Sequence, residues 1–278
     1  MTWRRAACWS VVLAGVWLLG TWPPPIWWRD HWPKCTAMMR ERARAPGCPA
    51  SHPLRLATVA PVLERMVVIG EDSRFWTHHG IDPEEIGEAL GLGQHGSLAA
   101  TARAAWNHRD RMRGASTITQ QLAKNLYLSP SRSPLRKLKE AVTALRLELA
   151  LPKTRILELY LGIAEWGPGI WGVDAASEKY FAVSPAALDE TAAAALAATL
   201  PQPRASNPAF HPERMMARRD LILARYHGVG VQVVPEADED TSAGPELVAP
   251  ADTQPAPPDT TGAERDSSAS DSTAADSS

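Results

Sequence analysis

Apolar residues recur along most of the chain at the spacing of one helix face. Residues 62–69 and, more clearly, residues 138–149 place apolar side chains at a 3.6-residue period. Residues 154–161 and the alanine-rich residues 188–200 also favour helices. The sequence has no convincing run of alternating apolar and polar residues and no internal repeat. The pattern therefore predicts a mainly helical region from about Pro53 to Gly230.

The start of the chain follows a different pattern, a continuous apolar run from Ala6 to Trp22. Its 17 residues are at the short end of a bilayer span, and tryptophans near both ends suit the two interfaces. Because the run ends in Trp-Pro-Pro-Pro without a small-residue cleavage site, it favours an uncleaved anchor over a signal peptide. Basic residues flank the run on both sides and leave its orientation open. The expected order is a stub (1–5), a transmembrane anchor (6–22) and a juxtamembrane segment (23–53).

Charge is unevenly distributed along the chain. The net charge is −2, but residues from Glu236 onward hold 11 acidic side chains and one basic one, which leaves 28 basic and 20 acidic before them. The 45% of hydrophobic residues excludes global disorder, whereas the acidic tail (236–278) is expected to be disordered. The basic body suits an anionic partner such as phosphate, nucleic acid or acidic lipid. Cys35 and Cys48 leave a disulfide and two free thiols both open, and no metal-ligand spacing occurs.

The first candidate for chemistry is the polar segment from Glu71 to Asp82, which follows an apolar helix that we expect to end at Gly70. An acid packed near Phe75 and Trp76 would be partly desolvated. Desolvation raises the pKa of a carboxyl group and makes its ionised form a better base. A polar loop with an incidental cluster of charges is the alternative interpretation.

A second candidate is the segment 114–128, where Gly and Ser precede an amphipathic helix. The free backbone N–H groups of such a helix start attract anions. Ser116, Gln120 and Lys124 project on adjacent turns of one side, and amides beside a cation suit a sugar phosphate. A capped helix with a solvated polar face explains the same pattern.

Two further segments are less specific. Arg136 and Glu140 lie opposite the apolar stripe of residues 138–149, as a surface ion pair or as the lining of a cleft. The glycines of residues 162–172 indicate a tight loop, and they do not follow a strand into a helix as dinucleotide binding requires. The sequence also has no Gly-x-Ser-x-Gly nucleophile elbow.

Taken together and in this order, the segments resemble the family 51 peptidoglycan glycosyltransferases, the polymerase module of bifunctional penicillin-binding proteins. Residues 71–82, 114–126 and 136–140 look like the first three motifs of that family, and residues 156–170 and 196–208 look like the later ones. The resemblance covers about residues 54 to 227. The monofunctional biosynthetic form is the better match, because the 51 residues after His227 are too few for a transpeptidase domain.

The resemblance implies a fold and an activity. The expected fold is mainly α, a lysozyme-like helical head with a small membrane-proximal jaw lobe, formed by a glycosyltransferase domain at 54–230. The expected reaction polymerises lipid II into β-1,4 glycan strands and releases undecaprenyl pyrophosphate. The expected location is the inner membrane, with the catalytic domain on the periplasmic side, where a Cys35–Cys48 disulfide is favoured. Expected partners are the nascent glycan chain, membrane lipids and cell-wall synthesis proteins, and no nucleic acid.

The same resemblance implies roles for individual residues. Glu71 is the expected general base of a single inverting displacement, and Glu140 is the second catalytic acid, which orients cations or a divalent metal. Substrate-binding positions are Asp72, Phe75, His78, Ser116, Thr117, Gln120, Gln121, Lys124, Asn125, Arg136, Lys137 and Lys153. No tightly bound cofactor and no dedicated metal cage are expected, with Mg²⁺ or Mn²⁺ as an assisting counter-ion at the pyrophosphate.

Two residues depart from the family pattern. Gly162 stands where the family usually has Asn, which is expected to loosen the helix end, and Pro152 is expected to break the helix before Lys153. Two alternatives to the polymerase stay open. One is a wall-cleaving enzyme of lysozyme-like fold, which needs an acid but no cationic cradle for a pyrophosphate. The other is a non-catalytic cell-wall scaffold.

Overall fold

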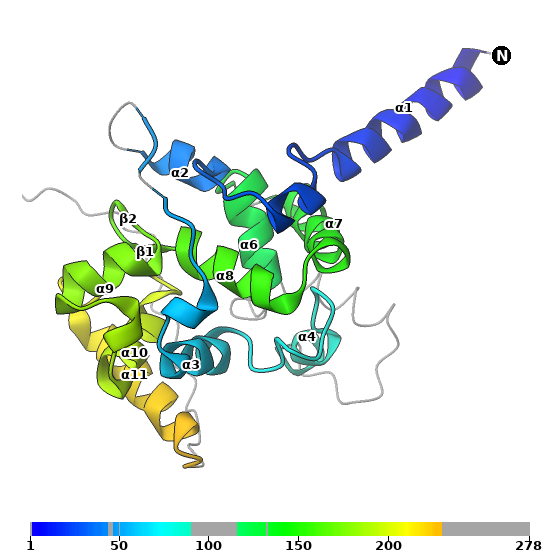
Figure 1. The fold of residues 1–278 in the computed structure, drawn as a ribbon. Coiled ribbons are helices and arrows are strands. Elements are labelled where there is room, and N and C mark those ends of the chain that lie inside the picture. The colour runs from blue at the N-terminus through cyan, green and yellow to red at the C-terminus, as the bar shows by residue number, and fades with distance from the viewer. Residues whose placement is uncertain (1, 44–46, 50, 90–115, 132, 230–278) are drawn as a thin grey trace, which may run out of the picture. The chain divides into compact units, whose positions relative to one another are not determined.

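The computed structural model describes residues 2–43, 47–49, 51–89, 116–131 and 133–229, and these residues are mainly helical with one small sheet (Figure 1). The α-helices are α1 (Thr2–Leu19), α2 (Ala37–Arg42), α3 (Pro61–Glu71), α4 (Pro83–Ala89), α6 (Ile118–Tyr127), α7 (Pro134–Ala150), α8 (Lys153–Ile163), α9 (Val173–Phe181), α10 (Glu190–Thr199) and α11 (Pro212–Tyr226). Short 3-10 helices are η1 (Pro25–Arg29), η2 (Leu56–Thr58) and η3 (Pro185–Ala187). The prediction of a mainly helical chain is confirmed. The predicted acidic tail (236–278) lies outside the described residues.

Local sequence signals explain where the central helices begin and end. Thr117 caps α6, and its side chain accepts a hydrogen bond from the backbone N–H of Gln120 while the Gln120 side chain accepts one from Thr117. Ser133 caps α7 in the same position, followed by a proline in the first turn. Pro152 separates α7 from α8, so the predicted helix break before Lys153 is confirmed.

A small antiparallel sheet occupies the segment in which the sequence indicated only a tight loop. Its strands are β1 (Glu165–Gly167) and β2 (Ile170–Trp171). Strands this short show no alternating pattern, so the sequence gives no signal for them. Gly169 and Gly172 have φ angles of 82° and 81°, in a region that favours glycine. Trp166, in β1, lies in the core, where its side chain is fully buried.

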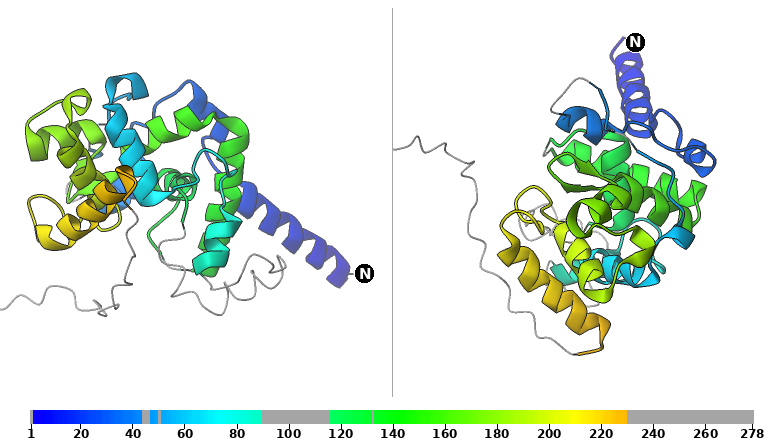
Figure 2. Two further views of the ribbon diagram at one scale, coloured as in Figure 1. Left: turned by 90° about the horizontal axis from the view of Figure 1, so that it is seen from below. Right: turned by 60° about the vertical axis from the view of Figure 1, so that its left-hand side comes forward.

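The helices of the described structure include two packed groups. In the first group α3, α10 and α11 pack on one another, and the left-hand view of Figure 2 shows α11 (orange) beside α3 (cyan). The alanine-rich face of α10 lets its neighbours approach closely, and nearly all of its residues are buried. In the second group α6 packs against α2, α7 and α8. This arrangement brings the end of α3 close to α6, which positions the site described below.

The apolar stripe of α7 faces outward, not into the core. Leu138 is 50% exposed and Leu149 is 88% exposed, while the buried face of the helix contains Glu140, Ala144 and Leu147. The interpretation of Arg136 and Glu140 as a surface ion pair is therefore wrong. The polar side of this helix is buried because it faces other polar groups of the site described below.

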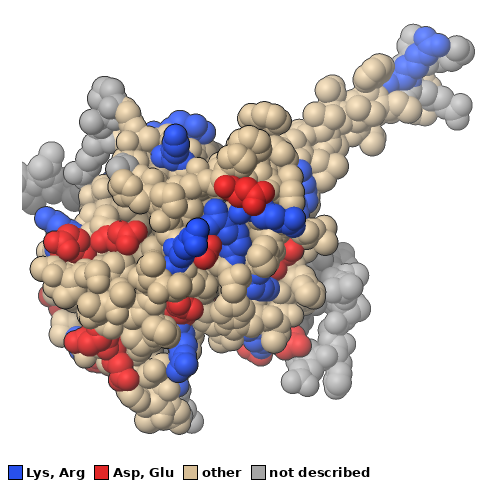
Figure 3. Space-filling model, in the orientation of Figure 1, with Lys and Arg blue, Asp and Glu red and all other residues tan. Residues whose placement is uncertain are grey.

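The first helix ends at Leu19, before the predicted end of the anchor at Trp22. Within the described part of the chain, no helix combines the length and the apolar character that crossing a bilayer requires. Along α1, Figure 3 shows arginine atoms toward the N-terminal end and otherwise uncharged atoms.

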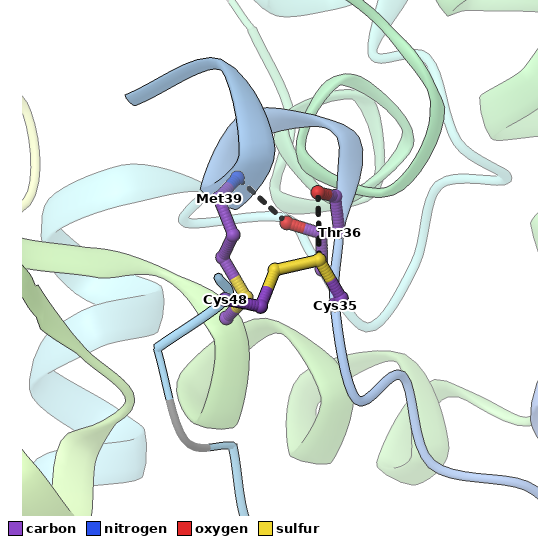
Figure 4. The surroundings of a disulfide bond; sticks show 4 residues. All are labelled: Cys35, Thr36, Met39 and Cys48. Carbon is purple, nitrogen blue, oxygen red and sulfur yellow. Dashed lines mark hydrogen bonds between the residues drawn. A yellow bond between two sulfur atoms is a disulfide. The ribbon is translucent and has the colours of Figure 1, made fainter. Parts of the chain in front are cut away.

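A disulfide joins Cys35 to Cys48 and encloses α2 in the loop that it closes (Figure 4). The two Cα atoms are 5.7 Å apart, within the usual range for such a bond. Thr36 caps α2 by accepting a hydrogen bond from the backbone N–H of Met39. Of the two possibilities that the sequence left open, the structure has the disulfide.

Gly162 is the second-last residue of α8, which ends at Ile163. The indole ring of Trp32, from the segment after α1, fills the place of a side chain. A Cβ atom at position 162 would lie 2.5 Å from Cζ2 of Trp32. The expected loosening of the helix end stays a prediction.

Candidate active site

Glu71 is the last residue of α3, and its side chain is only 6% exposed. Its Oε2 atom accepts a hydrogen bond of 2.8 Å from the side-chain amide of Gln121, and its Oε1 atom lies 3.2 Å from Nη2 of Arg218 on α11. Burial raises the pKa of the Glu71 carboxyl, and Arg218, Gln121 and Lys124 oppose this shift. A carboxylate in this setting is available as a base.

The amide of Gln121 is oriented by Tyr160 of α8. The Tyr160 hydroxyl donates a 3.0 Å hydrogen bond to Oε1 of Gln121, which turns the amide nitrogen toward Glu71. Burial and the nearby Glu71 charge raise the pKa of Tyr160 well above its ordinary value, so the phenol keeps its proton and stays a donor. The base is therefore held by contacts from α3, α6, α8 and α11.

Glu140 lies on the buried face of α7 and is 2% exposed. Its two oxygens are each paired with a cation of the same helix, Oε2 with Arg136 at 2.6 Å and Oε1 with Lys137. The Nε atom of Arg136 is buried and has no hydrogen-bond partner among the described residues. A buried donor without a partner is costly, which suggests that a ligand accepts a hydrogen bond here.

Ser116 connects the two acids. Its hydroxyl accepts a 2.7 Å hydrogen bond from Lys137, and its backbone carbonyl accepts a longer one of 3.4 Å from the Gln121 amide. The path from Glu71 through Gln121, Ser116 and Lys137 to Glu140 is thus continuous. The predicted acids belong to one polar network.

The charge of Lys124, on α6, acts on both acids. It influences the pKa of Glu71 and is itself influenced by Glu140. Burial lowers the pKa of Lys124, Glu140 opposes this shift, and the positive charges of Lys137, Arg42 and Arg136 add to it. No ion pair of Lys124 occurs within the described residues, so an incoming anion would relieve the repulsion.

Asp72 binds the start of α6, where the sequence predicted that an anion would bind. Its carboxylate accepts a 2.9 Å hydrogen bond from the backbone N–H of Ile118, the first residue of α6. His78 also donates to Asp72, at 2.9 Å, through Nε2, because its Nδ1 accepts from the backbone N–H of Gly80. The described start of α6 is therefore bound by an acid of the protein itself, and Gly114 lies outside the described residues.

Several predicted substrate-binding residues have structural partners. Thr117 and Gln120 cap α6, and the Thr117 hydroxyl also donates to the carbonyl of Gly80. Lys153 pairs with Glu148 at 2.8 Å and lies 4.5 Å from the ring centroid of buried Phe75. Asn125 is buried on α6. Contact of these residues with a substrate stays a prediction.

One group of acids has the spacing of a metal site. Oxygens of Asp72, Asp82 and Glu85 lie within 4.8 Å of one another. However, Asp72 is bound to His78 and Ile118, and Asp82 pairs with Arg74 at 2.6 Å. Burial, followed by the charges of Asp72 and Asp82, raises the pKa of Glu85 to about 7. Asp72 thus binds the start of α6, and Asp82 accepts hydrogen bonds from backbone N–H groups at the start of α4.

Comparison with known proteins decides the family. The transglycosylase family profile matches residues 46–227. Biosynthetic peptidoglycan transglycosylases of Azoarcus sp. (strain BH72) and Thiobacillus denitrificans are 37% identical over 232 residues and 40% identical over 210 residues. These matches cover 80% and 73% of this chain, and 95% and 84% of the two relatives. This chain belongs to the transglycosylase family. The predicted family and class of enzyme are confirmed, and Glu71 and Glu140 both lie inside the matched region of the transglycosylase.

Sequence reasoning missed Arg218 of the transglycosylase. This residue contacts both the carbonyl of Gly70, at 2.6 Å, and the Glu71 carboxylate. It is separated from Glu71 by 147 positions, and in the sequence it is one of several charged residues on an amphipathic helix. The only available signal was the polar face of α11, which does not reveal its partner.

Proposed function

We propose that this peptidoglycan glycosyltransferase polymerises lipid II into β-1,4 glycan strands and releases undecaprenyl pyrophosphate. The observation that carries the proposal is the hydrogen-bonded path between Glu71 and Glu140, together with the charge of Lys124, which acts on both acids. It combines a buried carboxylate, which suits a general base, with a group of cations, which suits a departing diphosphate.

In the proposed reaction, Glu71 takes the proton of the acceptor sugar 4-hydroxyl. The freed oxygen attacks the anomeric carbon of the donor and forms the new C–O bond. The bond from that carbon to the phosphate oxygen breaks on the opposite face, and its electron pair leaves with the diphosphate. The anomeric configuration therefore inverts. Gln121 and Arg218 hold the Glu71 carboxylate in place for the proton transfer.

Positive side chains neutralise the leaving diphosphate. Arg136 offers a buried Nε–H without a partner among the described residues, and Lys124 offers an ammonium group near both acids. Glu140 fixes Arg136 and Lys137, so these cations do not need to reorganise during the reaction. Because both oxygens of Glu140 are paired, this set does not fit a resident Mg²⁺ or Mn²⁺ ion. Any assisting metal is proposed to arrive with the substrate.

We also propose that the enzyme works at the inner membrane, with its catalytic domain on the periplasmic side. Support comes from the exposed leucines of α7 and from Ile26 and Trp27 of η1, which are also exposed. Large exposed apolar patches are typical of membrane or protein contacts. In this proposal α6, α7 and α2 form the membrane-proximal jaw, and α3, α10 and α11 belong to a lysozyme-like head. The nascent glycan chain is the second substrate, and partner proteins of cell-wall synthesis stay a prediction.

The test is polymerisation of purified lipid II. We expect Glu71→Gln to lower kcat by about 10²–10⁴-fold, because general-base catalysis is lost. Glu64→Gln, on the same helix, is the matched control and should keep wild-type activity. A fully active Glu71→Gln enzyme would refute the assignment of the base. Digestion of isolated wall sacculi without lipid II would favour the wall-cleaving alternative, and no turnover of either substrate would favour the scaffold.

A further inference from the structure

A cavity of about 110 Å³ lies between the segment that follows α1 and the helices α2, α6 and α7. Its walls include Thr21 and Trp22, which follow α1, together with Arg40 of α2, Tyr127 of α6 and Lys139 of α7. Helix α1 contacts α7, and α6 packs on both α2 and α7 (Figure 1). The volume is several times what one water molecule needs, so the cavity has room for a small polar group.

Positive charge gathers at this cavity without a neutralising acid. Arg40 and Lys139 line it, and no Asp or Glu is among its described lining residues. Arg146 of α7 donates hydrogen bonds to the carbonyl of Leu19 and, at 3.0 Å, to the hydroxyl of Thr21 in the cavity wall. None of the three cations has an ion pair within the described part of the chain. Burial and the charge of Arg146 lower the pKa of Lys139, so a bound anion would stabilise the charged lysine.

Tyr127 adds a hydroxyl donor to the same wall. Its oxygen accepts a 2.6 Å hydrogen bond from Nε1 of Trp28, and its own proton has no acceptor among the described residues. Burial raises the pKa of Tyr127, although Trp28 and Arg146 oppose the shift, so the phenol keeps this proton. The cavity thus presents N–H and O–H donors from three helices, and an oxyanion such as a phosphate is the ligand that they suit.

Apolar side chains beside the cavity favour the phosphate of a lipid over a free one. Trp22 in the cavity wall is 88% exposed, and Ile26 and Trp27, shortly after it, are 49% and 46% exposed. The Lys139 ammonium also lies 4.8 Å from the ring centroid of Trp17 in α1. An anionic phospholipid has the matching chemistry, because its phosphate needs cations and its acyl chains need apolar contacts.

We propose that this cavity binds the phosphate of an anionic phospholipid, which Arg40, Lys139 and the Tyr127 hydroxyl hold. The inference rests on the proposed function, since it places the enzyme at a membrane. None of the described residues that line the cavity belongs to the network of Glu71 and Glu140, so the phospholipid is a separate ligand from the substrate. It contacts the segment after α1 together with α2, α6 and α7, and so stabilises the orientation in which these elements meet.

The test titrates lipids into the full chain in micelles of a neutral detergent, without lipid II. Native mass spectrometry measures the Kd of phosphatidylglycerol and of zwitterionic phosphatidylcholine. We expect the wild type to bind one phosphatidylglycerol about tenfold more tightly than phosphatidylcholine, as for charge-assisted hydrogen bonds. Arg40→Ala and Lys139→Gln should each weaken phosphatidylglycerol binding by about tenfold. Arg65→Ala, at an exposed cation of α3, is the matched control and should bind as the wild type does.

Inorganic phosphate distinguishes the two sources of the ligand. It should not displace phosphatidylglycerol at an equal concentration, and displacement there would indicate a free-phosphate site and overturn the proposal. Equal affinity of the wild type for the two lipids would also overturn it, as would equal affinity of the Arg40, Lys139 and Arg65 variants for phosphatidylglycerol.

The absence of lipid II from the assay separates this inference from the proposed function. A chain that selects phosphatidylglycerol but does not polymerise lipid II supports the phospholipid site and overturns the proposed reaction. A chain that polymerises lipid II without any preference between the two phospholipids does the reverse.

Discussion

At the scale of single residues, the setting of Glu71 balances two opposing effects. Burial favours the neutral carboxyl group, while Arg218 and the Gln121 amide favour the carboxylate. The balance leaves the pKa of Glu71 above that of an ordinary glutamate, so the base is ionised only above that raised value. Activity should therefore fall on the acid side as Glu71 takes up a proton.

We predict that Arg218→Ala shifts the acid limb of the kcat/KM profile to higher pH. Removing the positive charge destabilises the Glu71 carboxylate, which raises the pKa of Glu71 further, so a higher pH is needed to ionise the base. Arg219→Ala is the control, because Arg219 pairs with Asp220 and not with Glu71. An acid limb that stays in place in the Arg218 variant would contradict the pairing seen here.

At the scale of elements, α8 contacts the segment after α1 at Gly162. The Trp32 ring lies on this glycine, donates a 2.8 Å hydrogen bond to the Ser51 hydroxyl, and has the Arg155 guanidinium 5.4 Å from its ring centroid. The space that an Asn side chain would need at position 162 is thus filled by Trp32, a residue far away in the sequence.

We predict that Gly162→Asn lowers the free energy of unfolding by about 1–3 kcal/mol, the usual cost of overpacking. The new side chain would collide with Trp32. Thermal or denaturant unfolding measures the loss. Because the two sites are in contact, Trp32→Ala should cost less in the Gly162→Asn background than in the wild type. Strictly additive effects of the two changes would argue against this contact.

At the scale of the whole molecule, the enzyme buries a polar face of α7 and exposes an apolar one. The buried face carries Glu140, and the exposed face carries Leu138, Leu145 and Leu149. The proposed reaction on a lipid-linked substrate would account for both, since the charges would meet the diphosphate and the leucines would meet the bilayer.

We predict that Leu149→Glu lowers kcat/KM by about tenfold with lipid II in vesicles, as expected when one leucine side chain no longer enters an apolar phase. Activity in detergent micelles should change little, because the site itself is untouched. Phe210→Glu, at an exposed apolar residue away from α7, is the control. An equal effect of Leu149→Glu in vesicles and micelles would exclude a bilayer contact.

Most of the helices and the membership of the family could be predicted from the sequence. The period of apolar residues predicted α3 and α7, because a helix repeats every 3.6 residues whatever surrounds it. The residue types of 154–161 and the alanine-rich residues 188–200 predicted α8 and α10. The order of the motifs indicated the class of enzyme and named Glu71 and Glu140. The partners of these acids, Arg218 and Tyr160, were not predicted, because contacts between distant positions leave no local pattern.

What the sequence by itself determined is which faces and which charged residues the protein has. Only the tertiary structure decided which other residues each face contacts and which face is exposed to solvent. The leucine stripe of α7 has the period of a core-facing helix, yet it is exposed, and the acid opposite it is buried with Arg136 and Lys137. Likewise Asp72 accepts a hydrogen bond from the start of α6, and Trp32 fills the space beside Gly162. The physical reason is that periodicity depends on neighbours three or four positions away, whereas burial and pairing depend on segments that folding brings together.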